Sequence, residues 1–151
     1  PECCAGKLLL AHPVLKDPNF RRAVILLSTH DADGAFGVVL NQPLGRELGE
    51  LSPDFAASPL ARVPLYRGGP VETDKLILAG WRQGGDAEIE LHFGLEPERA
   101  VALLADQHAT LRGFLGYAGW SGGQLENEMR QHTWFTAEPA DYNLAADEGA
   151  G

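Results

Sequence analysis

Length, composition and charge narrow the class of protein. The chain has 151 residues, of which 44% are hydrophobic and 22% charged, values typical of one folded domain and not of a disordered chain. We expect a single domain over residues 1–151, with flexible tails at 1–5 and at about 146–151. The formal net charge of −9 disfavours nucleic acid as a partner, and the apolar runs are too short to span a membrane. We therefore expect a cytoplasmic protein that is a monomer or a weak homodimer.

The first half of the chain contains apolar runs typical of buried strands, at residues 7–13, 22–30 and 35–43. Asp and Gly within 30–34 favour a turn, so residues 22–41 are predicted to form a hairpin with a loop longer than the minimum. Pro, Ser and Gly accumulate between Pro43 and Pro64. This segment predicts a long connection with at most one or two helical turns.

The second half contains both strands and helices. Strands are predicted at 63–71, 74–81, 112–119 and 132–139, and a short helix at 123–131 with Leu125 and Met129 facing inward. A longer helix is predicted at 96–111, with Pro97 in its first turn and Val101, Leu104 and His108 on one stripe. Residues 86–94 predict one more strand, in which Ala87, Ile89, Leu91 and Phe93 alternate with Asp86, Glu88, Glu90 and His92.

The order of these elements indicates the fold class. Runs of strands precede a few short helices, which is typical of an α+β domain with a mixed or mainly antiparallel sheet. Glycine accounts for 18 of the 151 residues, and several glycines fall inside predicted strands, where they usually mark bulges or corners. We therefore expect a strongly bent sheet, partly closed into a small barrel.

Gly119, Ser121 and Gly123 form the G-x-S-x-G pattern of a serine hydrolase's nucleophile elbow. In that fold the acid and the histidine follow the serine, but only thirty residues remain here and His132 is the only histidine among them. The favoured interpretation is that Ser121 caps the helix beginning near Gln124. The alternative is a small hydrolase that uses Ser121, His132 and one of Glu126, Glu128 or Glu138.

The other candidate sites are weaker. The polar face of 86–92 carries three carboxylates and an imidazole, but alternate residues over that length spread across some 13 Å, so a solvated strand face is favoured over a metal site. Arg67 with the following Gly-Gly-Pro could bind an anion, although a turn is the favoured interpretation. Cys3 and Cys4 are interpreted as incidental, with a redox role left open. No metal and no cofactor are expected.

Four blocks of the chain resemble the YqgE/AlgH family of bacterial proteins over nearly its whole length. They are Asp17-Pro18 with Phe20, Gly34-Ala35 through Asn41-x-Pro43, Gly68-Gly69-Pro70-Val71, and Gly116-Tyr117-Ala118-Gly119-Trp120 with Gly123-Gln124-Leu125-Glu126. The resemblance implies a single α+β domain with a bifurcated sheet partly closed into a small barrel. The resemblance does not identify any catalytic residue. The AlgH name suggests transcriptional regulation.

The residues and the resemblance together favour a non-enzymatic cytosolic protein that binds an unknown protein or small molecule, in regulation. The candidate surface consists of Arg67, Gly68, Gly69, Pro70, Gly119, Trp120, Gln124 and Glu126. We expect Gly69 and Gly119 to lie within about 15 Å, with an apolar floor from Trp120 and Pro70. If these blocks only build corners, Trp120 will be buried with its indole N–H bonded, and the glycines will have positive φ. The alternatives are the hydrolase above and a DNA-binding regulator.

Overall fold

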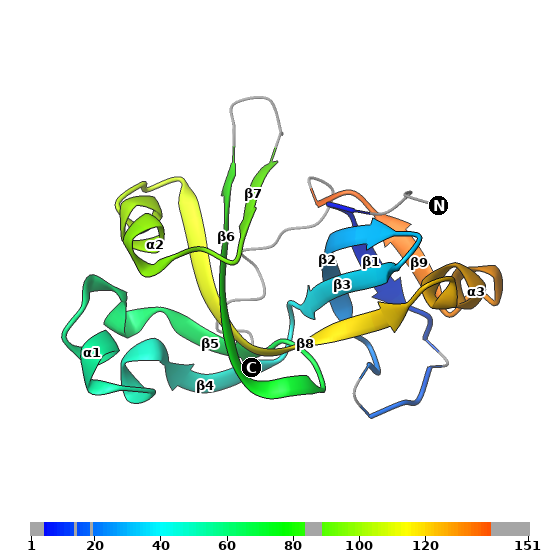
Figure 1. Cartoon of the computed structure of the whole chain (residues 1–151), viewed down its shortest axis with the longest axis horizontal. Helices are drawn as coiled ribbons and strands as arrows, with labels where there is room; N and C mark the ends of the chain where they lie inside the picture. Colours follow the sequence, from blue (N-terminus) through cyan, green and yellow to red (C-terminus); the bar gives the residue numbers. More distant parts are fainter. Residues whose placement is uncertain (1–4, 14, 19, 84–88, 140–151) are drawn as a thin grey trace.

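The computed structural model describes residues 5–13, 15–18, 20–83 and 89–139 (Figure 1). These residues form one mixed sheet of nine strands, with three α-helices and two 3-10 helices, which confirms the α+β class. The strands are β1 Leu8–Ala11, β2 Val24–Asp31, β3 Gly34–Val39, β4 Pro43–Glu47, β5 Pro64–Arg67, β6 Val71–Gln83, β7 Ile89–Phe93, β8 Ala109–Ser121 and β9 Trp134–Ala137. The tails expected at 1–5 and 146–151 lie outside the described residues, apart from residue 5.

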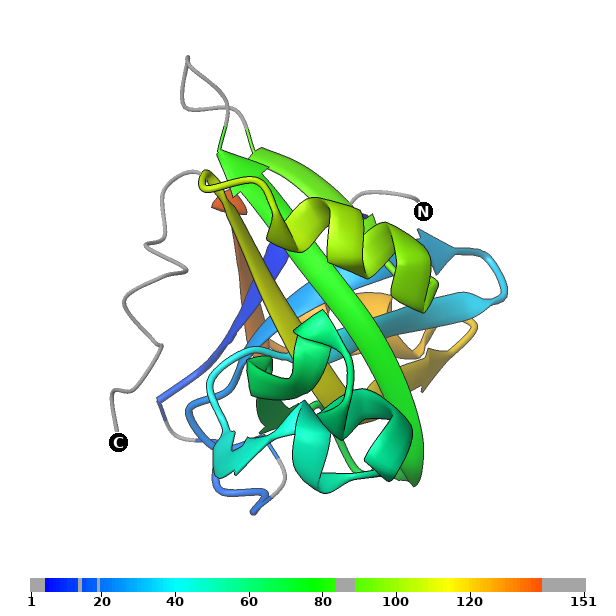
Figure 2. The ribbon, with the colours of Figure 1, turned by 90° about the vertical axis from the view of Figure 1, so that its left-hand side faces the viewer.

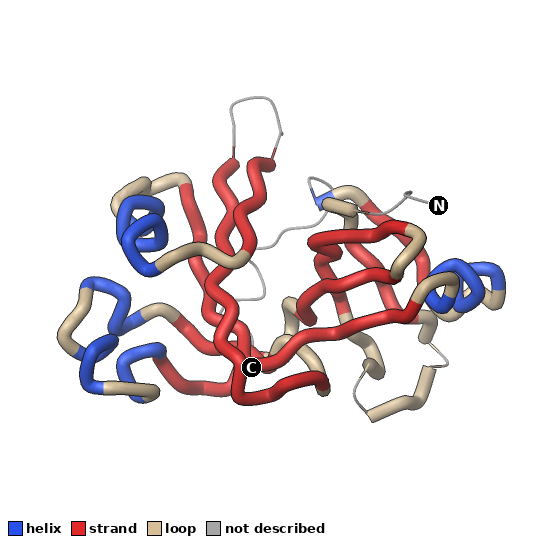
Figure 3. The backbone as a smooth tube through the Cα atoms, viewed as in Figure 1, coloured by secondary structure: helices blue, strands red, loops and turns tan. Residues whose placement is uncertain are grey.

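Strand β8 joins the two halves of the sheet. Its first part pairs with β5 in parallel and with β6 in antiparallel orientation, whereas its last four residues, Ala118 to Ser121, pair with β3. One half therefore contains β4, β5, β6 and β7, and the other contains β1, β2, β3 and β9 (Figures 1 and 3). The sheet is branched, with β8 as the shared strand.

The expected closure into a small barrel is not confirmed. In the described part of the chain the strand order is an open path, β4-β5-β8-β3-β2-β1-β9, with β6 and β7 as a side branch on β8. The physical reason lies near Gly116, which has a φ of +80° and is so close to the carbonyl oxygen of Gly69 that a Cβ would lie 2.4 Å from it. From Ala118 onward β8 pairs with β3 and no longer with β6, so the sheet divides into two branches at this point.

The predicted hairpin of 22–41 is present as β2 and β3, but its turn is tighter than predicted. Asp31 pairs with Gly34, so only Ala32 and Asp33 form the loop. The side chain of Asp31 accepts a hydrogen bond from the backbone N–H of Asp33 at 2.8 Å, and this local bond supports the short turn.

The connection of 43–64 contains a strand that the pattern did not indicate. All five residues of β4 are exposed, and the strand pairs with β5 alone at the edge of the sheet. An edge strand without a buried face has no apolar alternation, so periodicity could not reveal it. The connection also contains three short helices, η1 Leu48–Glu50, α1 Pro53–Ala56 and η2 Pro59–Arg62, where at most one or two helical turns were expected.

Helix α2 (Pro97–Leu104) is shorter than the predicted 96–111, although Pro97 does lie in its first turn. The side chain of Asp106 accepts the backbone N–H of His108 at 2.8 Å, which favours a turn over further helix. Leu104 is 42% exposed and His108 lies outside the helix, so the stripe predicted through them is wrong. Figure 2 shows α2 and the short helices together on the half of the sheet built from β5, β6 and the start of β8.

The central part of the hydrophobic core lies between the two halves. Leu26 and Val38 from one half pack in the same cluster as Ile77 and Trp81 from the other. Arg112 of β8 is fully buried there, with its guanidinium 4.3 Å from the Tyr66 ring centroid and 4.9 Å from that of Trp81. Its Nη1 donates to the carbonyl oxygen of Leu40 at 2.9 Å. The arginine therefore connects both halves from the shared strand.

Candidate functional site

The two glycine-rich blocks lie next to each other. The N–H of Gly68 donates to the carbonyl oxygen of Leu115 at 2.8 Å, and a Cβ on Gly69 would lie 2.6 Å from the backbone nitrogen of Ala118. Consecutive Cα atoms are about 3.8 Å apart, so Gly69 and Gly119 are well within the distance that a shared surface requires. The blocks are adjacent because the β5–β6 connection packs directly on the middle of β8.

Gly68 and Gly69 are buried and serve this close approach. A Cβ on Gly68 would lie 2.3 Å from the carbonyl oxygen of Gly116, and one on Gly69 would lie 2.2 Å from the carbonyl carbon of Tyr117. Side chains at these positions would push the two backbones apart. These two glycines therefore shape the corner and present no side chain to a ligand.

Trp120 does not form the expected apolar floor. It is 7% exposed, and its Nε1 donates to Oε1 of Glu128 at 3.0 Å. Trp134, which is 3% exposed, donates to the same oxygen at 2.9 Å, and the Phe20 ring stacks on Trp120 and meets Trp134 edge-on. This is the outcome expected where the block builds a corner of the fold.

Glu128 joins the side chains of this region through hydrogen bonds, a structural role that the sequence interpretation did not predict. Besides the two indoles, its Oε2 accepts a hydrogen bond from Nε2 of Gln124 at 2.9 Å. Gln124 and Glu128 lie four residues apart on helix α3 (Gln124–Arg130), which places them on one face. That spacing, with Trp120 before and Trp134 after the helix, is the sequence signal that could have found the cluster.

Ser121 is not the helix cap that we expected. The cap position is occupied by Gly123 with a φ of +80°, and Ser121 is the last residue of β8. Its N–H and its hydroxyl both contact Oε1 of Gln124, at 3.0 and 3.3 Å. Among the described residues, Gln124 is the hydrogen-bond partner of this hydroxyl, and an amide oxygen is too weak a base to activate a serine.

Glu126 lies on α3 beside a buried histidine. Its Oε2 is 3.3 Å from Nε2 of His30, which is 4% exposed. A hydrogen bond from its own backbone N–H, followed by the contact with His30, lowers the pKa of the Glu126 carboxyl. Glu126 thus fixes the start of α3 against β2 and does not form a rim with Arg67, whose Nη1 contacts Gln42 at 3.2 Å.

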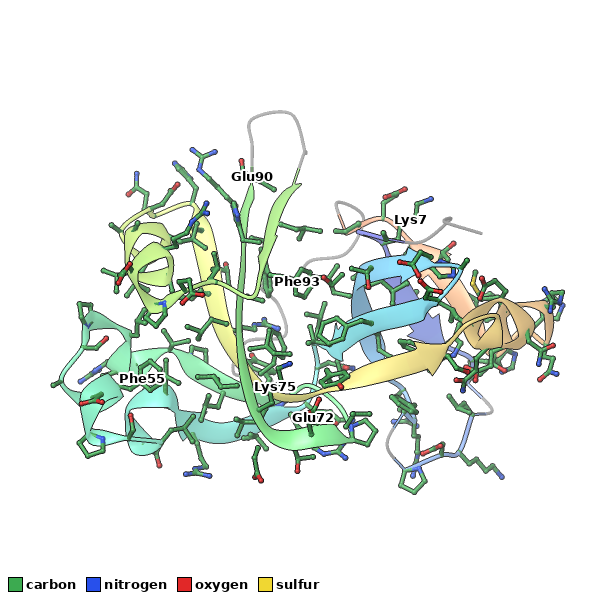
Figure 4. The ribbon with its side chains drawn as sticks, viewed as in Figure 1. Lys7, Phe55, Glu72, Lys75, Glu90 and Phe93 are labelled. Carbon is green, nitrogen blue, oxygen red and sulfur yellow. The ribbon has the colours of Figure 1, made fainter. Side chains whose placement is uncertain are left out.

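A different set of exposed side chains gathers where the blocks meet. The Phe36 and Tyr117 rings are 4.6 Å apart, and Val71, directly opposite Tyr117 in the β6–β8 pair, is 37% exposed. The Tyr117 hydroxyl donates to Oε2 of Glu72 at 2.6 Å, and Lys75 Nζ lies 5.7 Å from the ring centroid (Figure 4). We define the junction surface as Phe36, Pro70, Val71, Glu72, Lys75, Tyr117 and Gly119.

The bond to Glu72 has an electrostatic consequence for Tyr117. The carboxylate accepts the phenolic hydrogen and repels the negative phenolate, so the pKa of Tyr117 is raised above its usual value. The ring is therefore held as a neutral phenol in a fixed orientation. Of the eight residues expected to form the candidate surface, only Pro70 and Gly119 belong to the junction surface.

The remaining candidates do not assemble a metal site in the described part of the chain. There, no group of three or more His, Cys, Asp or Glu side chains could hold a metal ion. Glu90 and His92 of the proposed polar strand face are in contact, with His92 Nε2 2.8 Å from Glu90 Oε1, while Asp86, Ala87 and Glu88 lie outside the described residues. Cys3 and Cys4 lie outside them as well.

The fold and the site define a class of protein: a branched mixed sheet around one long shared strand, with a glycine-lined junction at the branch point. A family model described as AlgH-like matches residues 8–150. The chain belongs to this AlgH-like family. The resemblance stated from the sequence blocks is thereby confirmed.

Relatives and solved structures agree with this assignment. A UPF0301 protein of Streptomyces coelicolor is 39% identical over 150 residues, covering 90% of this chain and 77% of the relative. A UPF0301 protein of Chlorobaculum tepidum is 36% identical, covering 95% and 79%. The solution structure of the AlgH protein from Pseudomonas aeruginosa has a TM-score of 0.64 at 32% identity, over 93% of this chain and 78% of that one. A crystal structure of the Corynebacterium diphtheriae protein DIP2367 has a TM-score of 0.72 at 27% identity, over 97% and 80%.

None of these names states an activity. In the described part of the chain, no helix is long and apolar enough to cross a membrane. Function therefore has to be argued from the arrangement of side chains.

Proposed function

We propose that this chain is a non-enzymatic binding protein of the bacterial cytoplasm, which recognises a protein partner in a regulatory role through the junction surface. The observation that carries the proposal is the partly exposed aromatic pair at the centre of that surface. Phe36 and Tyr117 are only half-buried and their rings meet at a tilt of 38°, and Val71 beside them is 37% exposed. Aromatic side chains with apolar neighbours are the groups that dominate the binding energy of protein interfaces.

The surface is also held in one geometry before any partner binds. Tyr117 is fixed by its hydrogen bond to Glu72 and by Lys75 over its ring. Glu72 itself has a φ of +46°, a left-handed conformation that is costly for a residue with a side chain. Strain of this kind concentrates at binding sites, and a rigid surface lowers the entropy cost of association.

The openness of this surface favours a protein partner over a small molecule. Small ligands bind in concave pockets that bury most of their area. In the described part of the chain, cavities lie on other elements, around α2, around His132 and around η2. The Phe36 and Tyr117 rings, with the charged groups of Glu72 and Lys75 at their edge, instead resemble a protein–protein interface, which has an apolar centre and a polar rim.

The two alternatives from the sequence have less support. Hydrolysis through Ser121 would need an imidazole in place of the Gln124 amide that contacts the hydroxyl. Direct DNA binding would need a basic surface large enough to overcome a net charge of −9. Neither requirement is supported by an observation here.

The test compares two variants with the same chemical change. Val71→Glu places a carboxylate in the centre of the junction surface, and Leu104→Glu does so at a residue of similar exposure, 42%, on α2. Each protein is immobilised, bacterial extract is passed over it, and retained proteins are quantified. We expect a partner that is retained by the wild type and by Leu104→Glu and is lost with Val71→Glu.

Equal retention by both variants, or equal loss, would contradict the proposal, as would retention of nothing beyond the bare support. A Ser121→Ala variant, assayed with an activated ester, tests the alternative that the protein is a hydrolase with Ser121 as its nucleophile. We expect it to match the wild type, and a thousandfold loss of hydrolysis would favour the hydrolase instead.

A further inference from the structure

A cavity on the other side of the sheet carries a second, independent inference. It has a volume of about 320 Å³ and lies between α2 and the β6–β7 hairpin. Its lining residues are Arg82, Glu90, His92, Leu95, Arg99, Ala102, Leu103 and Asp106. This volume is at the lower end of the range found for small-molecule sites, roughly 300–1,000 Å³.

Two faces with regular spacing build this cavity. Arg99, Ala102 and Leu103 follow the spacing of three and four residues that places side chains on one face of α2, and Asp106 lines the cavity from the turn after this helix. Glu90 and His92 line it from β7, while Leu91 and Phe93, which alternate with them, pack on the central core cluster (Figure 4). Glu90 and His92, the described residues of the polar strand face, therefore line a cavity, and the Glu90 side chain remains exposed.

Most charges around the cavity are already matched. Arg82 Nε donates to Oδ2 of Asp106, and Arg82 is also the direct cross-strand neighbour of Glu90. The hydrogen bond and the charge of Asp106 raise the pKa of Arg82. In turn, hydrogen bonds from the His108 backbone and from Arg82 lower the pKa of Asp106. His92 contacts the remaining carboxylate, Glu90, at 2.8 Å.

Arg99 is the exception among these charges. Within the described residues its guanidinium forms no ion pair and no hydrogen bond. Arg99 is exposed and lines the cavity together with Leu95 and Leu103. Leu103 approaches the sheet closely, since a Cβ on Gly80 would lie 2.5 Å from its Cδ2. The cavity thus combines an apolar floor with one cation available to a ligand.

We propose that this cavity binds a small organic monocarboxylate, with its carboxylate on Arg99 and its apolar body over Leu95 and Leu103. Guanidinium and carboxylate groups form paired, charge-assisted hydrogen bonds. A monoanion is favoured over phosphate because, among the described lining residues, Arg99 is the only arginine without a carboxylate partner and can therefore compensate one negative charge. The site lies on α2, away from the junction surface, and does not depend on the proposed function.

Phenylacetate is a suitable probe, with phenylacetamide as its neutral analogue and inorganic phosphate as a dianion. Binding is followed by chemical-shift titration of the backbone amides of α2 and β7 in the whole chain. We expect saturable shifts with phenylacetate and much weaker ones with phenylacetamide and phosphate. We also expect Arg99→Gln to weaken phenylacetate binding by about tenfold, the loss typical of a charge-assisted hydrogen bond.

Arg46→Gln is the matched control, because it removes the same charge from an exposed position on strand β4. It should leave the affinity for phenylacetate unchanged. The proposal is overturned if phenylacetate causes no saturable shift, if the neutral amide or phosphate binds as well, or if both arginine variants weaken binding equally. The last result would mean that net charge, and not Arg99, attracts the probe.

Discussion

Replacement of Glu128 by alanine should destabilise the fold strongly, although Glu128 is only half-buried on a short helix. Its carboxylate accepts hydrogen bonds from the indole groups of Trp120 and Trp134 and from the amide of Gln124. The two tryptophans are 7% and 3% exposed, so water cannot readily replace the lost acceptor. The substitution therefore leaves two buried N–H donors without a partner.

The magnitude follows from those two donors. Each buried donor left unsatisfied costs about 1–3 kcal/mol, so the loss for both is about 4 kcal/mol in the free energy of unfolding. Gln124 is exposed and regains water, so its bond contributes little to the difference. Glu128→Gln keeps one carbonyl oxygen that can accept from both indoles and loses only the charge, and we expect a cost of about 1 kcal/mol.

Urea unfolding followed by tryptophan fluorescence measures these differences, because two of the three tryptophans lie in the cluster. Asn127→Ala, at an exposed neighbouring position on α3, serves as the control and should change stability by less than about 1 kcal/mol. If Glu128→Ala lost no more stability than Asn127→Ala, the carboxylate would not be the centre of the cluster.

Two further predictions concern the branch point. Gly69→Ala should lower the free energy of unfolding by about 3 kcal/mol or more, since its Cβ would lie 2.2 Å from backbone atoms of Tyr117. Gly45 has a φ of +69° but open space around it, so the control variant Gly45→Ala should lower the free energy of unfolding by only about 1 kcal/mol in the same urea assay. Glu72→Gln should lower the pKa of Tyr117 in an NMR titration, because the carboxylate raises it. The stabilising effect of a raised pKa is present below the unfolded value of about 10 and is lost as pH rises through the folded pKa, so the two proteins should converge in stability at high pH. An unchanged Tyr117 pKa would show that the hydrogen bond does not hold in solution.

Local patterns predicted the elements whose own side chains face a core. The β2–β3 hairpin was marked by apolar runs on both sides of an Asp-Gly turn, and the burial of Leu125 on α3 followed from its helical spacing. Strand β4 carried no such signal, because both of its faces are exposed. Helix α2 was overestimated, because the Asp106 side-chain bond that favours a turn there competes with a continuing helical pattern.

The candidate site was predicted less well than the fold. The adjacency of the two glycine-rich blocks could be inferred, since glycines inside strands indicate close backbone approach. The spacing of Gln124 and Glu128 between Trp120 and Trp134 could have indicated the shared carboxylate, but the burial of Trp120 also depends on Phe20, which is distant in the sequence. Long-range packing of this kind leaves no periodic trace in a single sequence.

The glycines and the exposed side chains of the branch point have one physical origin. Glycines at 68, 69 and 116 let the β5–β6 connection approach β8 so closely that no side chain fits between the backbones. Next to these glycines Val71 is exposed, whereas Tyr117 and Phe36 are half-buried and pack against the central core cluster. The backbone under this surface is fixed by close packing, and the Tyr117 ring on it is held by Glu72 and Lys75. For this reason Val71→Glu should change recognition without unfolding the chain, whereas substitution of the glycines beneath should unfold it.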